Sequence, residues 1–217
     1  MSYSNLSIDG KLAASQQALA NAASNAEIAA LLAGFGYDAA RIAGGQALYD
    51  AAQAAQVAQK QEYGEQYAAS QTFDDAWKTA NQTYMQLVKV ARVAFSSDPN
   101  AATALGIAGR RKPTYPGWLE QAQQFYTTAL ANVDFQTELA RFGITLEKLQ
   151  AGKALVDAVV AAKQAQGSET AEAQAATQAR DAALEALDAW MSDFIAIARI
   201  ALEGTQLSEA LGILERS

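Results

Sequence analysis

The chain has 217 residues, of which 51% are hydrophobic, chiefly alanine, and its 16 basic and 23 acidic residues give a net charge of -7. This length allows a sizeable core, and the negative charge would repel a phosphate backbone, so we expect no nucleic-acid partner. The chain contains no cysteine and no histidine, which excludes disulfides, thiolate metal sites, Ser-His-Asp and Cys-His catalysis, and the zinc-protease helix motif.

The N-terminal part predicts two short helices. Residues 1–10 are rich in serine, asparagine and glycine and are expected to be irregular, whereas the alanine-rich residues 12–23 predict a helix. A second helix is predicted over residues 26–33. Gly34 and Gly36 end it, since glycine is the usual residue after a helix C-terminus.

A much longer helical stretch runs from Asp38 to Phe95. Asp38 stands where an N-cap belongs, and the stretch contains no proline and no turn dipeptide. From Ile42 onward, a stripe of residues taken alternately every three and four positions keeps its phase, with apolar ends and a polar middle. Asp98 followed by Pro99 then forces a turn.

A linker at residues 108–117 holds two of the three prolines and a basic run at residues 110–112. It predicts a surface loop, and three basic residues on an acidic protein are more typical of a solvated loop than of a site for an acidic partner or membrane headgroups. Short helices are then predicted over residues 118–131 and 135–141. A second long stretch follows over residues 145–202, again opened by an N-cap residue.

The chain contains one segment twice. A shift of 107 positions aligns residues 32–95 with residues 139–202 without a gap, with 23 identities over 64 positions, of which 12 are not alanine. We therefore expect a single all-α domain over residues 1–217, an internally duplicated helical bundle with pseudo-twofold symmetry, whose repeats cover about 12–107 and 118–213. Matched pairs include Phe35/Phe142, Gly36/Gly143, Gly45/Gly152, Asp50/Asp157 and Arg92/Arg199.

Two structures fit the long stretches. In the first, each is one helix of about 58 residues, roughly 87 Å long, and the two pack antiparallel, flanked by the short helices. In the second, each turns near residues 60–70 and 167–177 into an αα-hairpin, and two hairpins form a four-helix bundle. The rarity of such long helices favours the hairpins. The unbroken phase and the lack of a shared turn signal favour the long helices, which we prefer.

Matched charges predict how the copies would pair. An antiparallel pairing centred on Gln71 and Gln178 would place Asp50 beside Arg199. The same pairing would place Asp157 beside Arg92, whereas a hairpin would pair Asp50 with Arg92. We interpret these charges as structural salt bridges rather than catalytic groups.

Gly45 and Gly152 are matched glycines inside predicted helices. Glycine there costs about 1 kcal/mol relative to alanine, so the pair predicts close approach of a neighbouring helix. The tyrosines and tryptophans fall mostly on the apolar stripes, which predicts core packing rather than a ligand cage.

The sharpest candidate site is a carboxylate pair at i, i+3 spacing that occurs in both copies, as Glu62 with Glu65 and as Glu169 with Glu172. Paired carboxylates on one helix face can bind hard cations such as Mg²⁺, Mn²⁺ or Ca²⁺. Without histidine or further ligands, solvated surface charges explain them better. The sequence therefore predicts no catalytic, cofactor-binding or metal-binding residue, with these four glutamates as the one metal candidate.

These observations favour a non-enzymatic structural or protein-interaction bundle that presents helical faces to a protein partner or to a second copy. A membrane-active or lipid-binding helical protein is the alternative, since alanine-rich amphipathic helices can rearrange onto bilayers. A carboxylate-metal hydrolase at the four glutamates comes third. No cofactor motif is present. The absence of a signal peptide and of a long apolar stretch leads us to expect a cytoplasmic protein.

Overall fold

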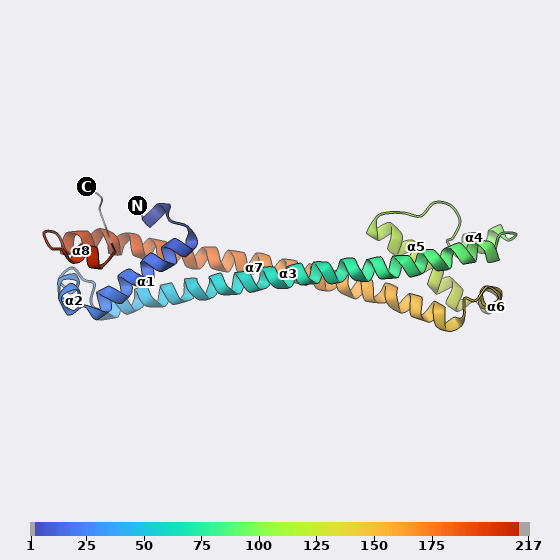
Figure 1. Ribbon diagram of the computed structural model, residues 1–217, viewed down its shortest axis with the longest axis horizontal. Coiled ribbons are helices and arrows are strands. Elements are labelled where there is room, and N and C mark those ends of the chain that lie inside the picture. The colour runs from blue at the N-terminus through green and yellow to red at the C-terminus, as the bar shows by residue number, and fades with distance from the viewer. Residues whose placement is uncertain (1–2, 213–217) are drawn as a thin grey trace. The chain divides into compact units, whose positions relative to one another are not determined.

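The computed structural model describes residues 3–212, of which 84% are helical. No strand occurs in this range, which confirms the all-α prediction. The elements in chain order (Figure 1) are η1 (Tyr3–Asn5), α1 (Ile8–Ser24), α2 (Ala26–Ala33), α3 (Ala39–Ala94), α4 (Pro99–Ala104), α5 (Tyr115–Ala131), α6 (Val133–Arg141), α7 (Leu146–Ala201) and α8 (Leu207–Ala210).

The start of the chain is more regular than its composition predicts. α1 begins at Ile8, inside the stretch expected to be irregular, because Ser7 caps it: the Ser7 side chain accepts a hydrogen bond from the backbone N–H of Gly10 at 3.2 Å. The predicted N-cap of α3 is confirmed, since Asp38 accepts a hydrogen bond from the backbone N–H of Arg41 at 2.9 Å.

α3 and α7 are each one uninterrupted helix of 56 residues. The hairpin alternative is therefore wrong, and the long-helix prediction is confirmed. The glycines that could have marked a turn, Gly64 and Gly167, are exposed positions where an added Cβ would meet nothing within 4 Å. Each therefore costs only the intrinsic helix propensity of about 1 kcal/mol, which the packed ends of these helices can offset.

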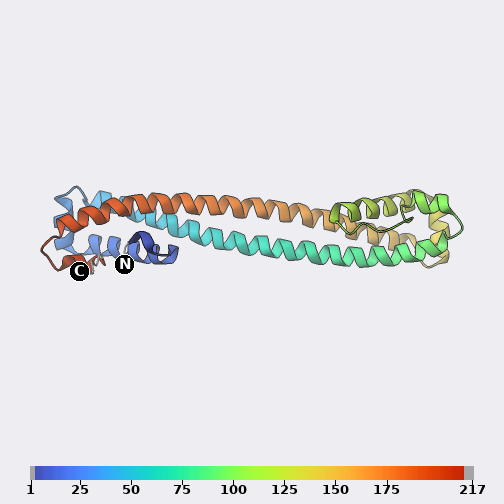
Figure 2. The same cartoon turned by 90° about the horizontal axis from the view of Figure 1, so that it is seen from above.

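The chain divides into two compact units. Unit 1 comprises Met1–Gly64 and Ala171–Ser217, and unit 2 comprises Glu65–Thr170. In unit 1 the first half of α3 packs antiparallel to the second half of α7, together with α1, α2 and α8 (Figures 1 and 2). In unit 2 the second half of α3 packs antiparallel to the first half of α7, together with α4, α5 and α6. The single domain and the pseudo-twofold relation stay predictions.

Trp190 of α7 packs against the core of unit 1. Its ring stacks on Phe194 with centroids 5.1 Å apart, and Tyr37 meets it edge-on at 5.6 Å. Trp190 lies directly over Gly45 of α3, where an added Cβ would come within 2.4 Å of the indole. Gly45 is therefore required by the close approach of a side chain from α7.

The core of unit 2 is richer in aromatic rings. Tyr84 of α3 packs against Phe125 and Tyr126 of α5 at centroid distances of 5.9 and 6.2 Å. Gly152 of α7 receives the Tyr126 ring, and an added Cβ there would lie 2.4 Å from the phenol oxygen. The predicted close approach at both matched glycines is confirmed, although different helices supply the ring.

The predicted pairing register is wrong in unit 2. Gln166 Nε2 donates to Ser70 Oγ at 3.2 Å, and the Lys163 ammonium lies 4.8 Å from the centroid of the Phe73 ring. A register centred on Gln71 and Gln178 would have placed Ser70 opposite Ala179. The long alanine-rich stripe keeps its phase in several registers, so the positions of the matched charges were not enough to select the register that forms.

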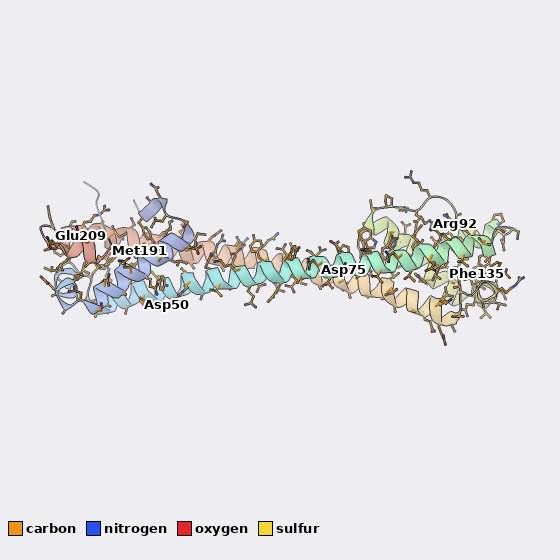
Figure 3. The ribbon with its side chains drawn as sticks, viewed as in Figure 1. Asp50, Asp75, Arg92, Phe135, Met191 and Glu209 are labelled. Carbon is orange, nitrogen blue, oxygen red and sulfur yellow. The ribbon has the colours of Figure 1, made fainter. Side chains whose placement is uncertain are left out.

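The matched charges have other partners. Arg92, near the end of α3 in unit 2 (Figure 3), donates to the carbonyl oxygens of Ile107 at 2.8 Å and Gly109 at 2.5 Å. Asp157 pairs instead with Lys153 of its own helix at 2.8 Å. The expected Asp157–Arg92 salt bridge is therefore not formed, because the guanidinium serves to hold the loop after α4.

Candidate functional site

The four candidate glutamates lie on the long helices. Glu62 and Glu65 are one turn apart on α3, in units 1 and 2 respectively, and Glu169 and Glu172 are one turn apart on α7, in units 2 and 1. Within unit 2, a carboxylate oxygen of Glu65 lies within 4.8 Å of one of Glu169. The structure thus brings together one glutamate from each predicted pair.

The chemistry of these two groups does not require a metal. Glu65 is exposed and Glu169 half-buried, and Oε2 of Glu169 is a buried atom that accepts no hydrogen bond among the described residues. A Ca²⁺ or Mg²⁺ site takes about six or more oxygen ligands, some of which can be water. Two carboxylates are a minimal start for such a site, so the metal interpretation stays a hypothesis.

A polar network in unit 1 joins the N-terminal segment to α7; it consists of Tyr3, Lys11, Ser15 and Asp188. The Tyr3 hydroxyl lies 3.0 Å from Ser15 Oγ and donates to Asp188 Oδ1 at 3.1 Å. The Lys11 ammonium pairs with the other oxygen of Asp188. Burial is the main cause that raises the pKa of Tyr3 to about 12. The network borders a pocket of about 330 Å³ lined also by Ser192 and Arg199.

This network is suited to anchoring rather than to catalysis. A nucleophilic serine needs a neighbouring base, whereas Ser15 faces a phenol whose raised pKa keeps it neutral. Asp188 is already neutralised by Lys11. Sequence reasoning missed the network because Tyr3 and Asp188 are 185 positions apart and belong to no recurring motif.

An apolar groove, here called the alanine groove, lies between α1, α2 and α3 of unit 1 and has a volume of about 430 Å³. Its residues are Leu19, Ala22, Ala23, Ala29, Tyr37, Asp38, Ala39, Ile42, Ala43, Gln46, Ala47 and Asp50. Leu19, Ala22, Tyr37 and Ile42 are buried, whereas the alanines of α3 and both carboxylates are exposed. The groove is therefore an open apolar channel with an acidic edge.

Larger side chains stand at the corresponding positions of unit 2. At the same 107-residue offset, Tyr126 corresponds to Leu19, Leu130 to Ala23 and Leu146 to Ala39. Tyr126 and Leu130 belong to the packed core of unit 2. The alanine groove thus results from small residues on both α1 and α3 of unit 1.

Exposed apolar side chains recur at matched positions near one end of each unit, and we call them the end pairs. In unit 1, Phe35 in the turn after α2 is 49% exposed and Ile200 in the last turn of α7 is 56% exposed. In unit 2, their counterparts Phe142 and Val93 are 43% and 60% exposed. Both views place the α2–α3 turn and the end of α7 at one end of unit 1, and the α6–α7 turn and the end of α3 at one end of unit 2.

The basic run of the linker serves mainly the structure of unit 2. Arg111 donates to the Tyr84 hydroxyl at 2.8 Å and to the carbonyl oxygens of Gly106 and Ala108, both at 2.7 Å. Lys112 pairs with Glu120 at 2.5 Å. Two of the three cations are therefore engaged within the unit, so the basic run is less solvated than the sequence predicted.

Within the described part of the chain, no helix combines the length and hydropathy needed to cross a bilayer. Comparison with protein-family models, with curated proteins and with solved structures finds no match to this chain.

Proposed function

We propose that this chain is a non-enzymatic, internally duplicated interaction scaffold that binds one protein partner through the end pair of each unit. Large exposed apolar groups that gather on a surface commonly mark protein-interaction sites. The observation that carries the proposal is their recurrence: Phe35 and Ile200 in unit 1 have matched apolar counterparts, Phe142 and Val93, in unit 2. A scaffold with two such sites would bind two copies of the same partner.

The helix boundaries support the duplication. α1, α2 and α3 begin at Ile8, Ala26 and Ala39, and α5, α6 and α7 each begin 107 positions later. The turn before each long helix uses a glycine in the left-handed region, at Gly36 with φ 81° and at Gly143 with φ 78°. Asn25 and Asn132 cap α2 and α6 in the same way. These equivalences extend the sequence match beyond residues 32–95.

The proposal is tested by affinity capture and sedimentation. The wild-type chain, the variants Phe35→Ser with Ile200→Ser and Phe142→Ser with Val93→Ser, and their combination would be used as bait in a lysate of the source cells. We expect the wild-type chain to capture one partner. Each double variant should retain less of this partner than the wild type, and the combined variant should retain none, because each unit supplies one of two equivalent sites. Val57→Ser and Tyr67→Ser, which remove equally exposed apolar groups elsewhere, are the matched controls.

Two results would contradict the proposal. The first is capture that does not respond to the end-pair substitutions. The second is concentration-dependent self-association in analytical ultracentrifugation that these substitutions abolish, since the partner would then be a second copy. Co-sedimentation with liposomes of mixed neutral and anionic lipid tests the membrane alternative, for which we expect the chain to remain in the supernatant because of its net charge of -7.

A further inference from the structure

We infer that the alanine groove of unit 1 binds an amphipathic helix that carries apolar residues on one face and lysine or arginine beside them. The inference rests on the proposed interaction function and names one class of partner. It uses a surface other than the end pairs, so the two can be tested separately.

The shape of the groove fits a helix. On α3, the lining positions Ala39, Ala43, Ala47 and Asp50 recur at i, i+4, i+8 and i+11, which places them on one helix face over about 16 Å, or three turns. Alanine at three of these positions allows the backbone of a partner helix to approach closely, because the spacing of packed helices depends on the side chains between them.

The openness of the groove favours a helix over a small molecule. Ala43 and Ala47 are exposed although they line it. A pocket for a small molecule usually buries about 70–90% of its ligand. An amphipathic helix laid along the channel instead inserts a few apolar side chains spaced at i, i+3 or i+4, and i+7, and covers the remainder with its own backbone.

The charge of the groove selects a basic helix. Asp38 accepts its hydrogen bond from the Arg41 backbone N–H at 2.9 Å, and Asp50, on the first half of α3 (Figure 3), accepts from Gln46 Nε2 at 2.9 Å. Both donors are neutral, so neither of these hydrogen bonds pairs a carboxylate with a cation. The Arg41 guanidinium does not line the groove; it stacks on the Tyr37 ring with its Cζ 3.9 Å from the centroid.

Unit 2 lacks this arrangement at the corresponding positions. Lys153 stands where unit 1 has Gln46, and it neutralises Asp157, the counterpart of Asp50, at 2.8 Å. Thr145 replaces Asp38. The combination of a small-residue channel and an Asp50 carboxylate that meets a neutral glutamine, where unit 2 has a lysine, is thus specific to unit 1, and it complements a partner with cations flanking its apolar face.

The test uses fluorescence anisotropy of the full chain with a labelled synthetic peptide. The peptide is about 18 residues long, or five helical turns, with leucines at i, i+4, i+7 and i+11 and lysines beside them. A second peptide carries glutamates in place of the lysines. We expect saturable binding of the lysine peptide. The glutamate peptide should bind with an affinity at least roughly tenfold lower, since two attractive charge contacts become repulsive.

Substitutions then locate the site. Ala47→Phe places a ring in the channel and should abolish binding, and Asp50→Asn should weaken it roughly threefold, the size of one partly shielded charge contact. The matched substitutions in unit 2, Ala154→Phe and Asp157→Asn, should leave the affinity unchanged. Circular dichroism of each variant checks that it is folded, which we expect because Ala47 and Ala154 are both exposed.

Four outcomes would overturn the inference: no saturable binding of the lysine peptide, equal binding of the glutamate peptide, equal effects of the unit 2 substitutions, or binding of decyltrimethylammonium in the groove without binding of the peptide. The last would identify a pocket for a small amphiphilic cation. The end-pair variant Phe142→Ser with Val93→Ser should bind the peptide normally, so failure of the end-pair proposal is distinguished from failure at the groove.

Discussion

At the residue scale, the matched glycines show what the sequence could and could not predict. The positions of Gly45 and Gly152 predicted close approach because glycine inside a helix needs a compensating contact. Nothing in the sequence indicated that Trp190 of α7 would fill the space in one unit and Tyr126 of α5 in the other. Which side chain occupies such a space depends on the tertiary register, and that register was predicted wrongly.

Alanine at either glycine should destabilise the protein. A Cβ at Gly45 or Gly152 would lie 2.4 Å from an aromatic side chain, and overpacking of this kind costs about 1–3 kcal/mol, offset in part by the better helix propensity of alanine. Urea unfolding followed by circular dichroism measures the change. Gly64→Ala is the control: an added Cβ meets nothing there, so it should stabilise by up to about 1 kcal/mol.

Tyr3→Phe should reveal the polar network through its pH dependence. Removing the hydroxyl eliminates the hydrogen bonds to Asp188 and Ser15, at a cost of about 1 kcal/mol near neutral pH. The pKa of Tyr3 is raised from 10.0 to about 12 in the folded protein, so the tyrosine stabilises the fold below pH 10 and this contribution is lost as the pH rises toward 12. The difference in unfolding free energy between wild type and variant should therefore shrink over that range.

Glu169→Gln distinguishes the metal hypothesis from simple charge repulsion. If Glu65 and Glu169 are only neighbouring carboxylates, the amide removes a like-charge contact and the midpoint of thermal unfolding should rise slightly. Millimolar Mn²⁺ should then leave the wild-type midpoint unchanged. A Mn²⁺-dependent increase that the substitution abolishes would instead support a metal site, because a ligand that binds only the folded state stabilises it.

At the scale of elements, the long helices follow from features that the sequence displays openly. α3 and α7 carry no proline, and Gly64 and Gly167 are exposed, so neither breaks the hydrogen-bond ladder. The candidate sites were less predictable. The alanine groove combines α1, α2 and α3 through residues that look like ordinary helix formers. Its acidic edge depends on Gln46, whereas the position 107 residues later, in unit 2, is Lys153.

At the scale of the whole molecule, the chain has two separate cores connected by two continuous helices. The buried cluster around Leu187 and Phe194 belongs to unit 1, and the cluster around Tyr84 and Phe125 belongs to unit 2. The polar middles of α3 and α7 contribute few buried residues. Each unit therefore has its own source of stability, and local opening should follow the units.

Amide hydrogen exchange on a core variant tests this independence. Phe125→Ala removes a fully buried ring of unit 2, a change that typically costs about 3–5 kcal/mol. We expect faster exchange in α5, in the second half of α3 and in the first half of α7, with little change in α1 and α2. The matched experiment, Phe194→Ala, should produce the converse pattern. Equal acceleration in both units by either variant would mean that the long helices transmit the loss of packing along their whole length, because continuous helices can also couple two cores into one cooperative transition.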